Sequence, residues 1–257
     1  MTWNEGAGTV SRTFDSWKGS DEQNRAFLKL STQWSADAYD QTWKQAEAAL
    51  NEVFDPDRHY GDEHVDIFDD AVDGLWPHDY HWLAEAAVLK NAVSSFEVYL
   101  EKGLQEILQP WRLTEDGQPH RFVLKTGGYE SPTWGTLVRA YTLLDQAAET
   151  LTVNVNSGDV KRARSLRHLL THQNGELRSE SALKEWHSDH EAHQPPAYLG
   201  GRVTLGTRRV LETVDLLGDV VRQTDAAVWS FSPWGPSDPK QFISQLAENG
   251  IAEVVPQ

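Results

Sequence analysis

Apolar side chains recur at helical intervals along most of this chain, and this spacing predicts a series of long helices. The first helix is expected from Asp21 to about Phe54, with Ser20 or Asp21 as its N-terminal cap. Residues 1–20 combine glycines with polar side chains, so we expect an irregular lead-in there. The positions expected to face the core are Phe27, Leu30, Trp34, Ala38, Trp43, Ala46 and Leu50.

The same spacing predicts further helices over residues 78–111, 133–152, 159–174 and 204–229, and a short one over 239–249. Pro110 ends the first of these because proline lacks an N–H and clashes with the preceding turn. Its packing side is expected to carry Leu83, Ala87, Lys90, Ser94, Val98 and Gly103. The segment RFVLKTGGYESP fits either a short strand with a turn or a loop. We find no repeat and no linker, so the pattern predicts an all-α bundle of about five long helices, one domain over residues 21–257.

Charge is distributed unevenly along the chain. The sequence has 23 Lys and Arg against 39 Asp and Glu, a formal net charge of −16, and residues 1–100 hold 19 of the acidic and 7 of the basic side chains. This balance argues against nonspecific nucleic-acid binding as the main role, but it allows a local basic site in the second half. The absence of cysteine excludes disulfides and thiol catalysis. With no apolar run of membrane-spanning length and no secretion signal, we expect a soluble cytoplasmic protein with no membrane contact.

The acidic excess is densest in residues 55–79, which carry nine acidic side chains and one arginine. A solvated acidic loop with a short helix is the preferred interpretation. A divalent-cation site is the alternative, although the spacing lacks the glycine and terminal glutamate of an EF-hand loop.

The stretch RSLRHLLTHQNGELR, from Arg164 to Arg178, reverses this acidic trend. Between Lys161 and Arg178 there are five Lys or Arg and two His, opposed only by Glu176. Ser157 or Asp159 is expected to cap the helix, and an Asn-Gly pair ends it. Cations in a last turn complement the helix dipole, which accounts for one or two of these residues but not for all of them. The remainder predicts a phosphate-binding site.

The order Arg167-His168-Leu169-Leu170-Thr171-His172 resembles the R-x4-6-H motif of the HEPN superfamily, including the polar residue directly after the arginine and the following Asn174-Gly175. The helix segment AVSSFEVYLEKGL also resembles the helix that packs against this motif in HEPN bundles. The resemblance covers about residues 80–230. It implies an HEPN-like helical bundle with metal-independent endoribonuclease activity, acting as a toxin or antiphage-defence effector. It also implies a homodimer in which two motifs face each other, RNA as the substrate, and an antitoxin or defence-system protein as a further partner.

These residues suit such a reaction, because RNA supplies its own 2′-OH nucleophile and no cofactor or metal is expected. Arg167 would bind phosphate oxygens through its planar fork of donors, His172 would transfer protons, and His168 would orient or assist. In an ideal helix Arg167 and His172 lie about 140° apart, so a second copy is expected to complete the pocket. Additional substrate contacts are expected from Arg164, Asn174 and Arg178.

Two alternatives remain open. A catalytically silent HEPN-like interaction or nucleotide-binding module would fit the acidic N-terminal half, which repels RNA. A metal-dependent enzyme could use His187, His190 and His193, although no fourth ligand is evident and an exposed polar helix end is the preferred interpretation. Arg208 and Arg209 are expected to be surface cations that could extend an RNA-binding surface.

Overall fold

The computed structural model describes residues 10–53, 80–110, 112–115, 118–148, 154–188 and 198–256. This part of the chain is mostly helical, as predicted. The helices are α1 (Arg12–Val53), α3 (Tyr80–Leu108), α4 (Trp134–Ala148), the 3-10 helix η1 (Asn154–Asn156), α5 (Gly158–His172), α6 (Glu180–Ser188), α7 (Thr207–Ser230) and α8 (Lys240–Glu248). The acidic segment 55–79, for which a loop or a cation site was expected, lies outside the described residues.

A small antiparallel sheet accompanies the helices. Its strands β1 (Arg112–Glu115), β2 (Gln118–Leu124) and β3 (Ala252–Pro256) lie in the order β1-β2-β3. The strand alternative for RFVLK is therefore correct. Strand β3 was not predicted, because its partner residues in β2 lie far away in the sequence and leave no local pattern.

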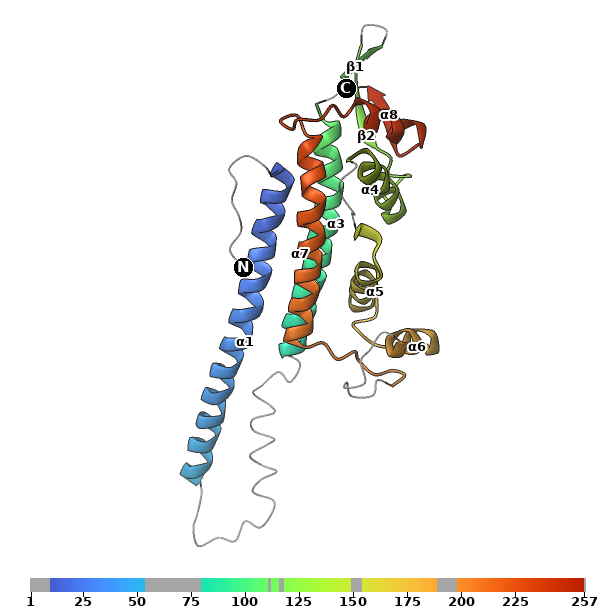
Figure 1. Ribbon diagram of the computed structural model, residues 1–257. Coiled ribbons are helices and arrows are strands. Elements are labelled where there is room, and N and C mark those ends of the chain that lie inside the picture. Colours follow the sequence, from blue (N-terminus) through green and yellow to red (C-terminus); the bar gives the residue numbers. More distant parts are fainter. Residues whose placement is uncertain are drawn as a thin grey trace.

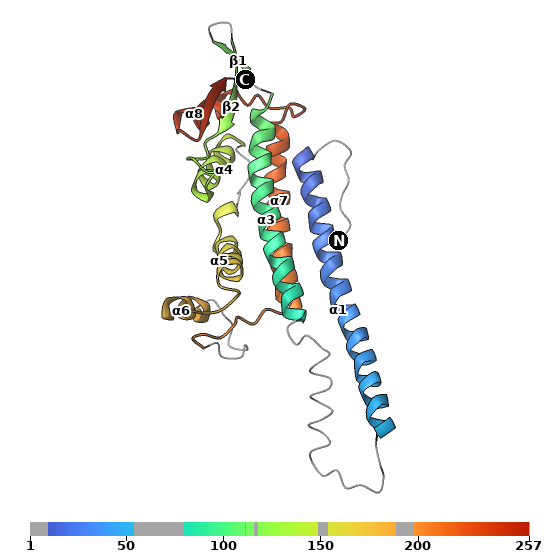
Figure 2. The same cartoon turned by 180° about the vertical axis from the view of Figure 1, so that it is seen from behind.

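Helix α3 is the centre of the arrangement (Figures 1 and 2). Helix α7 runs beside α3 in the same direction, and α1 runs antiparallel to both and extends past them at one end. Helices α4, α5 and α6 follow one another along the other side of the α3–α7 pair. The sheet and α8 lie at the end near α4.

The packing surface of α3 differs from the predicted side. Leu83 and Val98 are 53% and 48% exposed. Of the predicted set, Gly103 is buried, and a Cβ there would lie 2.9 Å from the Tyr141 hydroxyl oxygen and 3.3 Å from Val228. Because α3 contacts α1, α4, α5 and α7, its apolar side chains are distributed over several sides, and a single stripe of small residues does not mark the interface.

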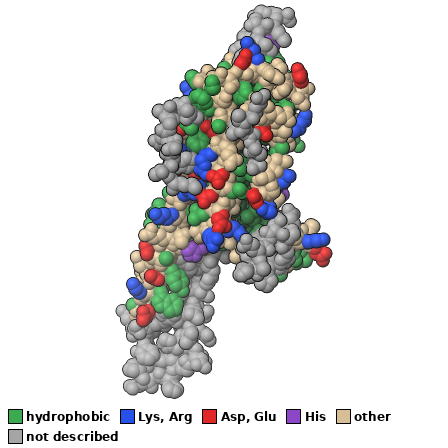
Figure 3. Space-filling view, in the orientation of Figure 1, with side chains coloured by type: hydrophobic (Ala, Val, Ile, Leu, Met, Phe, Trp, Pro, Cys, Tyr) green, Lys and Arg blue, Asp and Glu red, His purple; other side chains and the backbone are tan. Residues whose placement is uncertain are grey.

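The predicted apolar face of α1 is also wrong. Phe27 and Trp34 are 50% and 60% exposed, and Figure 3 shows hydrophobic side chains on the part of α1 that extends past α3 and α7. The buried side of α1 instead carries Asp21, Asn24, Leu28, Ser31 and Ser35. Hydrogen bonds explain this: the Asn91 amide, for example, donates to Asn24 Oδ1 over 2.6 Å.

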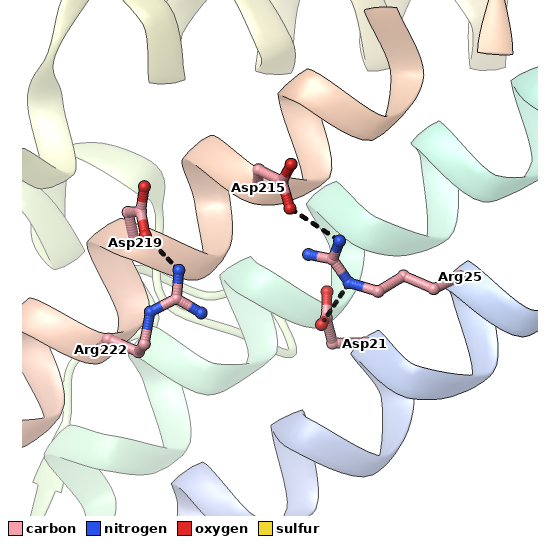
Figure 4. A network of polar contacts seen from close by, with 5 residues as sticks. All are labelled: Asp21, Arg25, Asp215, Asp219 and Arg222. Carbon is pink, nitrogen blue, oxygen red and sulfur yellow. Dashed lines mark hydrogen bonds and ion pairs between the residues drawn. The ribbon is translucent and has the colours of Figure 1, made fainter. Parts of the chain in front are cut away.

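Charged contacts join α1 to α7 (Figure 4). The Arg25 guanidinium donates from Nε to Asp21 over 2.8 Å and from Nη1 to Asp215 over 2.7 Å. Beside this bridge, Asp219 and Arg222 form an ion pair within α7. Arginine with two carboxylates gives directional contacts, so this network fixes the register between the two helices.

Helix α1 begins at Arg12, inside the segment predicted as an irregular lead-in to residue 20. The cap is Ser11, whose hydroxyl accepts the Phe14 N–H over 3.0 Å. Two carboxylates from neighbouring helices complete this helix start: Asp225 accepts the Ser11 N–H over 3.0 Å, and Glu106 accepts the N–H of the second helical residue over 3.0 Å. Negative charge at a helix N-terminus is favourable, so the bundle itself extends the helix toward the chain start.

Asp225 is a buried carboxyl that makes the free energy of unfolding depend on pH. Burial raises the pKa of this carboxyl above its ordinary value, and hydrogen bonds from Ser11 and Tyr99 oppose the rise only in part. Because the folded state then binds more protons than the unfolded state, this group makes the free energy of unfolding fall as pH rises through the window between the two pKa values.

The variant Asp225→Asn cannot ionise at this position and should lack this contribution to the pH dependence of the free energy of unfolding. We expect the free energy of unfolding of wild type minus that of Asp225→Asn to decrease as pH rises from about 4, the ordinary pKa of aspartate. Denaturant unfolding of both proteins at a series of pH values measures this difference. A difference that grows with pH would contradict the assignment.

Candidate functional site

Helix α5 carries the motif, and local signals define where it begins. Ser157 has extended backbone angles (φ −62°, ψ 160°), and its hydroxyl accepts the Val160 N–H over 3.2 Å. Of the two predicted caps, Ser157 is therefore the one used, while Asp159 forms an ion pair with Arg162 in the first turn. Helical spacing predicts an apolar stripe of Val160, Ala163, Leu166 and Leu170; Val160, Ala163 and Leu170 are buried, and Leu166 is half-buried in the cavity wall.

The predicted stop at Asn174-Gly175 is confirmed. Both residues have left-handed backbone angles, with φ of 52° and 76°, and the Gly175 N–H donates to the Leu169 carbonyl over 3.2 Å. A Cβ at Gly175 would lie 2.6 Å from the ring of Trp82, so glycine is required for space as well as for φ. Trp82 in turn donates to the Val203 carbonyl over 2.8 Å. The end of α5 is thus fixed against the start of α3 and the segment before α7.

A cavity of about 1050 Å³ lies between α5, α6 and the first turns of α7, and we call it the α5–α7 cavity. The side chain of Glu97 from α3 and that of Trp134 from α4 close one part of it. Basic side chains from α5 and α7 line it: Lys161, Arg162, Arg164, Arg167, His168 and Arg209. A volume of this size is typical of a small-molecule or nucleotide site.

The acidic residues of the lining are already paired. Three carboxylates contribute to the wall, and each forms an ion pair with an arginine: Glu97 with Arg164, Asp159 with Arg162, and Glu212 with Arg208. The half-buried Arg167 forms no hydrogen bond or ion pair through its side chain with any residue that the structure describes. The cavity therefore retains uncompensated positive charge in a protein of net charge −16.

Arg164, expected to bind substrate, has a structural role in this arrangement. Its Nε donates to Glu97 over 2.7 Å, and its guanidinium lies over the Trp134 ring at 3.8 Å from the ring centroid. These two contacts join α5 to α3 and α4 through Arg164. They could not be predicted from the motif, because both partners belong to other helices.

The other two predicted substrate contacts lie outside the cavity. The exposed Asn174 occupies the left-handed position that ends α5. Arg178 is 59% exposed and pairs with Glu176 over 2.9 Å. Within one chain neither residue is brought together with Arg167 in the cavity lining.

The two histidines of the motif stack on each other, with ring centroids 4.4 Å apart and an angle of 43° between the rings. This contact follows from the spacing of the two residues, which lie one helical turn apart. Both rings are exposed, yet His168 lines the α5–α7 cavity and His172 does not. One chain thus brings Arg167 and His168 together and leaves His172 at the edge.

Arg209 of α7 also lines the α5–α7 cavity. It was predicted to be a surface cation, but its side chain is half-buried in the cavity wall, and its Nη1 is shielded from solvent. The adjacent Arg208 does fit the prediction, since its side chain is 92% exposed. Nothing in the local sequence separates these two neighbours; only the packing of α7 against α5 does.

The alternative of a metal-dependent enzyme gains no support from the described ranges. No group of three or more His, Asp or Glu able to hold a metal occurs within them. Of the predicted metal cluster, His190 and His193 lie outside these ranges, as does the side chain of His187. None of the described helices is both long and apolar enough to cross a membrane.

Comparison of the chain with protein-family models, with curated proteins and with solved structures found no match.

Proposed function

We propose that this protein is a metal-independent endoribonuclease of HEPN type whose substrate phosphate binds in the α5–α7 cavity. The observation that supports this most directly is the unpaired guanidinium of Arg167, which lines a basic cavity together with His168 in a strongly acidic protein. The motif resemblance extends the proposal to a toxin or antiphage-defence effector acting on RNA, with an antitoxin or defence-system protein as a partner.

The proposed reaction needs a proton acceptor, a proton donor and charge stabilisation. His172 takes the proton of the RNA 2′-OH, whose oxygen attacks the adjacent phosphorus and forms a 2′,3′-cyclic phosphate. The imidazolium formed in this step, oriented by its contact with His168, gives the proton to the departing 5′-oxygen. The planar guanidinium of Arg167 binds two phosphate oxygens and stabilises the negative charge of the transition state.

RNA cleavage in EDTA tests this function. We expect purified protein to cut single-stranded RNA with the same rate before and after EDTA treatment, because the 2′-OH nucleophile requires no metal-bound water. A double variant, Arg167→Ala with His172→Ala, purified in the same way, controls for a contaminating nuclease. Absence of cleavage by the wild type, or equal cleavage by the double variant, would exclude the proposal.

A homodimer is part of the proposal, because His172 lies outside the cavity that holds Arg167 in one chain. If Arg167 of one copy works with His172 of the other, mixed dimers of Arg167→Ala and His172→Ala proteins contain one complete site. Random exchange of subunits should then restore about one quarter of the wild-type rate. We expect this recovery after co-refolding of the two inactive proteins. An inactive mixture would place the reaction within a single chain.

A silent nucleotide-binding module is the second candidate function. The position of His172 outside the cavity favours it, since a binding site needs the arginines but no proton carrier. Nucleotide binding without RNA cleavage by the wild-type protein would decide for this candidate.

A further inference from the structure

Two residues that line the α5–α7 cavity, Arg209 and Gln173, each have a buried polar atom without a partner within the described ranges. Nη1 of Arg209 donates no hydrogen bond, and Oε1 of Gln173 accepts none, although both atoms are shielded from solvent. Buried side-chain donors and acceptors are normally paired, and an unpaired charged donor is the most costly kind. The two side chains therefore keep hydrogen-bonding capacity that no described residue uses, and both belong to the wall of one cavity.

The N-terminus of α7 does not account for anion binding at this site. Glu85 of α3 lies at this terminus, where it accepts the N–H of Gly206, the residue before the helix, over 3.0 Å and the Thr207 hydroxyl over 2.8 Å. The helix dipole is thus compensated by a carboxylate. The group available to an anion is the side chain of Arg209 itself.

The dimensions and lining of the cavity restrict the ligand further. A volume of about 1050 Å³ accommodates one nucleotide, or a short unpaired stretch, whereas a double helix is far too large. The half-buried Trp186 adds an aromatic wall, and unpaired bases are recognised by stacking on such side chains and by hydrogen bonds to their edges. A nucleotide carries both an anionic phosphate and N–H or O–H donors.

We propose that Arg209 and Gln173 form a subsite for an unpaired nucleotide. The guanidinium of Arg209 binds a phosphate oxygen, and the side-chain amide of Gln173 forms a hydrogen bond with a base edge or a ribose hydroxyl. This inference rests on the proposed function in that it assigns single-stranded RNA as the substrate, and it adds two residues outside the R-x4-6-H motif.

Calorimetric titration with each of the four ribonucleoside 5′-monophosphates, and with the corresponding nucleosides, tests the subsite. We expect Arg209→Met to weaken binding of the monophosphates about 10- to 100-fold, the loss expected for a charge-assisted hydrogen bond. Nucleoside binding should be unaffected by this change. Gln173→Leu should weaken the binding of both classes.

Arg222→Met is the matched control, because Arg222 lies on the same helix as Arg209 and neither Arg222 nor its partner Asp219 lines the cavity. It should bind nucleotides as the wild type does. Thermal unfolding with and without nucleotide verifies that each variant is folded, and the stabilisation by ligand should be lost in Arg209→Met and kept in Arg222→Met.

The outcomes separate the subsite from the proposed function when RNA cleavage is measured on the same proteins. Nucleotide binding that depends on Arg209, without any cleavage, supports the subsite and rejects the nuclease. RNA cleavage by a wild type that binds no mononucleotide up to millimolar concentration, or equal nucleotide binding by Arg209→Met and Arg222→Met, overturns the subsite.

Discussion

Replacing His172 by alanine is expected to lower the rate of RNA cleavage by about 10²–10⁴-fold, the usual contribution of general acid–base catalysis. Imidazole changes its protonation near neutral pH, and alanine offers no group that can replace it. The exposed ring of His172 contacts His168 and no core residue is removed with it, so the variant should keep its fold. Initial rates on single-stranded RNA in EDTA, with thermal unfolding as a check of folding, measure the effect.

Comparison of His172→Ala with His168→Ala distinguishes a site formed by two copies from a site within one chain. If two copies form the site, His172 carries the proton and His168 supports it by stacking, so His168→Ala should lose less activity than His172→Ala. His168 lines the cavity beside Arg167 in the same chain, so the opposite order would indicate that one chain performs the reaction alone. His81→Ala is the control, because His81 contacts Ser35 between α3 and α1 and lies outside the cavity lining. It should keep wild-type activity.

The limits of the motif helix could be predicted because the signals for them are local. Ser157 caps the helix through an N–H three residues away, and the left-handed Asn174-Gly175 pair ends it. The stacking of His168 on His172 follows from helical spacing alone. Each of these features depends on residues within one or two turns.

The packing faces of the long helices could not be predicted in the same way. Apolar periodicity assigns a core face where the buried side is apolar, but the buried side of α1 combines the apolar Phe14, Trp17 and Leu28 with polar residues such as Asn24 and Ser31. Its aromatic residues Phe27 and Trp34 are consequently exposed, contrary to the pattern. Burial of a polar group depends on a partner in another helix, and a single sequence does not reveal that partner.

The dependence on partners in other helices also explains which residues of the cavity could be predicted from the sequence. Arg167 and His168 were predicted as site residues from the motif, and both line the cavity, whereas His172 of the same motif does not. Arg209 reaches the cavity from α7, and the carboxylate and ring that occupy Arg164 come from α3 and α4. Arg164 is thus paired with groups of other helices, whereas Arg209 is half-buried in the cavity wall, because tertiary packing decides where each guanidinium lies.

Changing Arg167 to lysine is expected to lower the rate of RNA cleavage by about 10²–10³-fold, the loss typical when one preorganised donor to a transition-state charge is removed. Lysine keeps the positive charge, but its ammonium group is a point charge that does not reproduce the planar pair of N–H donors. Substrate binding should weaken less than the rate, since electrostatic attraction to the phosphate persists. Separate measurement of kcat and KM therefore distinguishes the two contributions.

The matched control for this change is Arg222→Lys. Arg222 lies on α7, is paired with Asp219 and is absent from the lining of the cavity, so its replacement tests the loss of a guanidinium away from the site. That variant should cleave RNA at the wild-type rate. A catalytic rate for Arg167→Lys equal to that of Arg222→Lys would show that the bidentate geometry of Arg167 does not matter. The arginine of the motif would then only attract RNA, as any cation in the cavity wall does, and the transition-state charge would have to be stabilised by other groups.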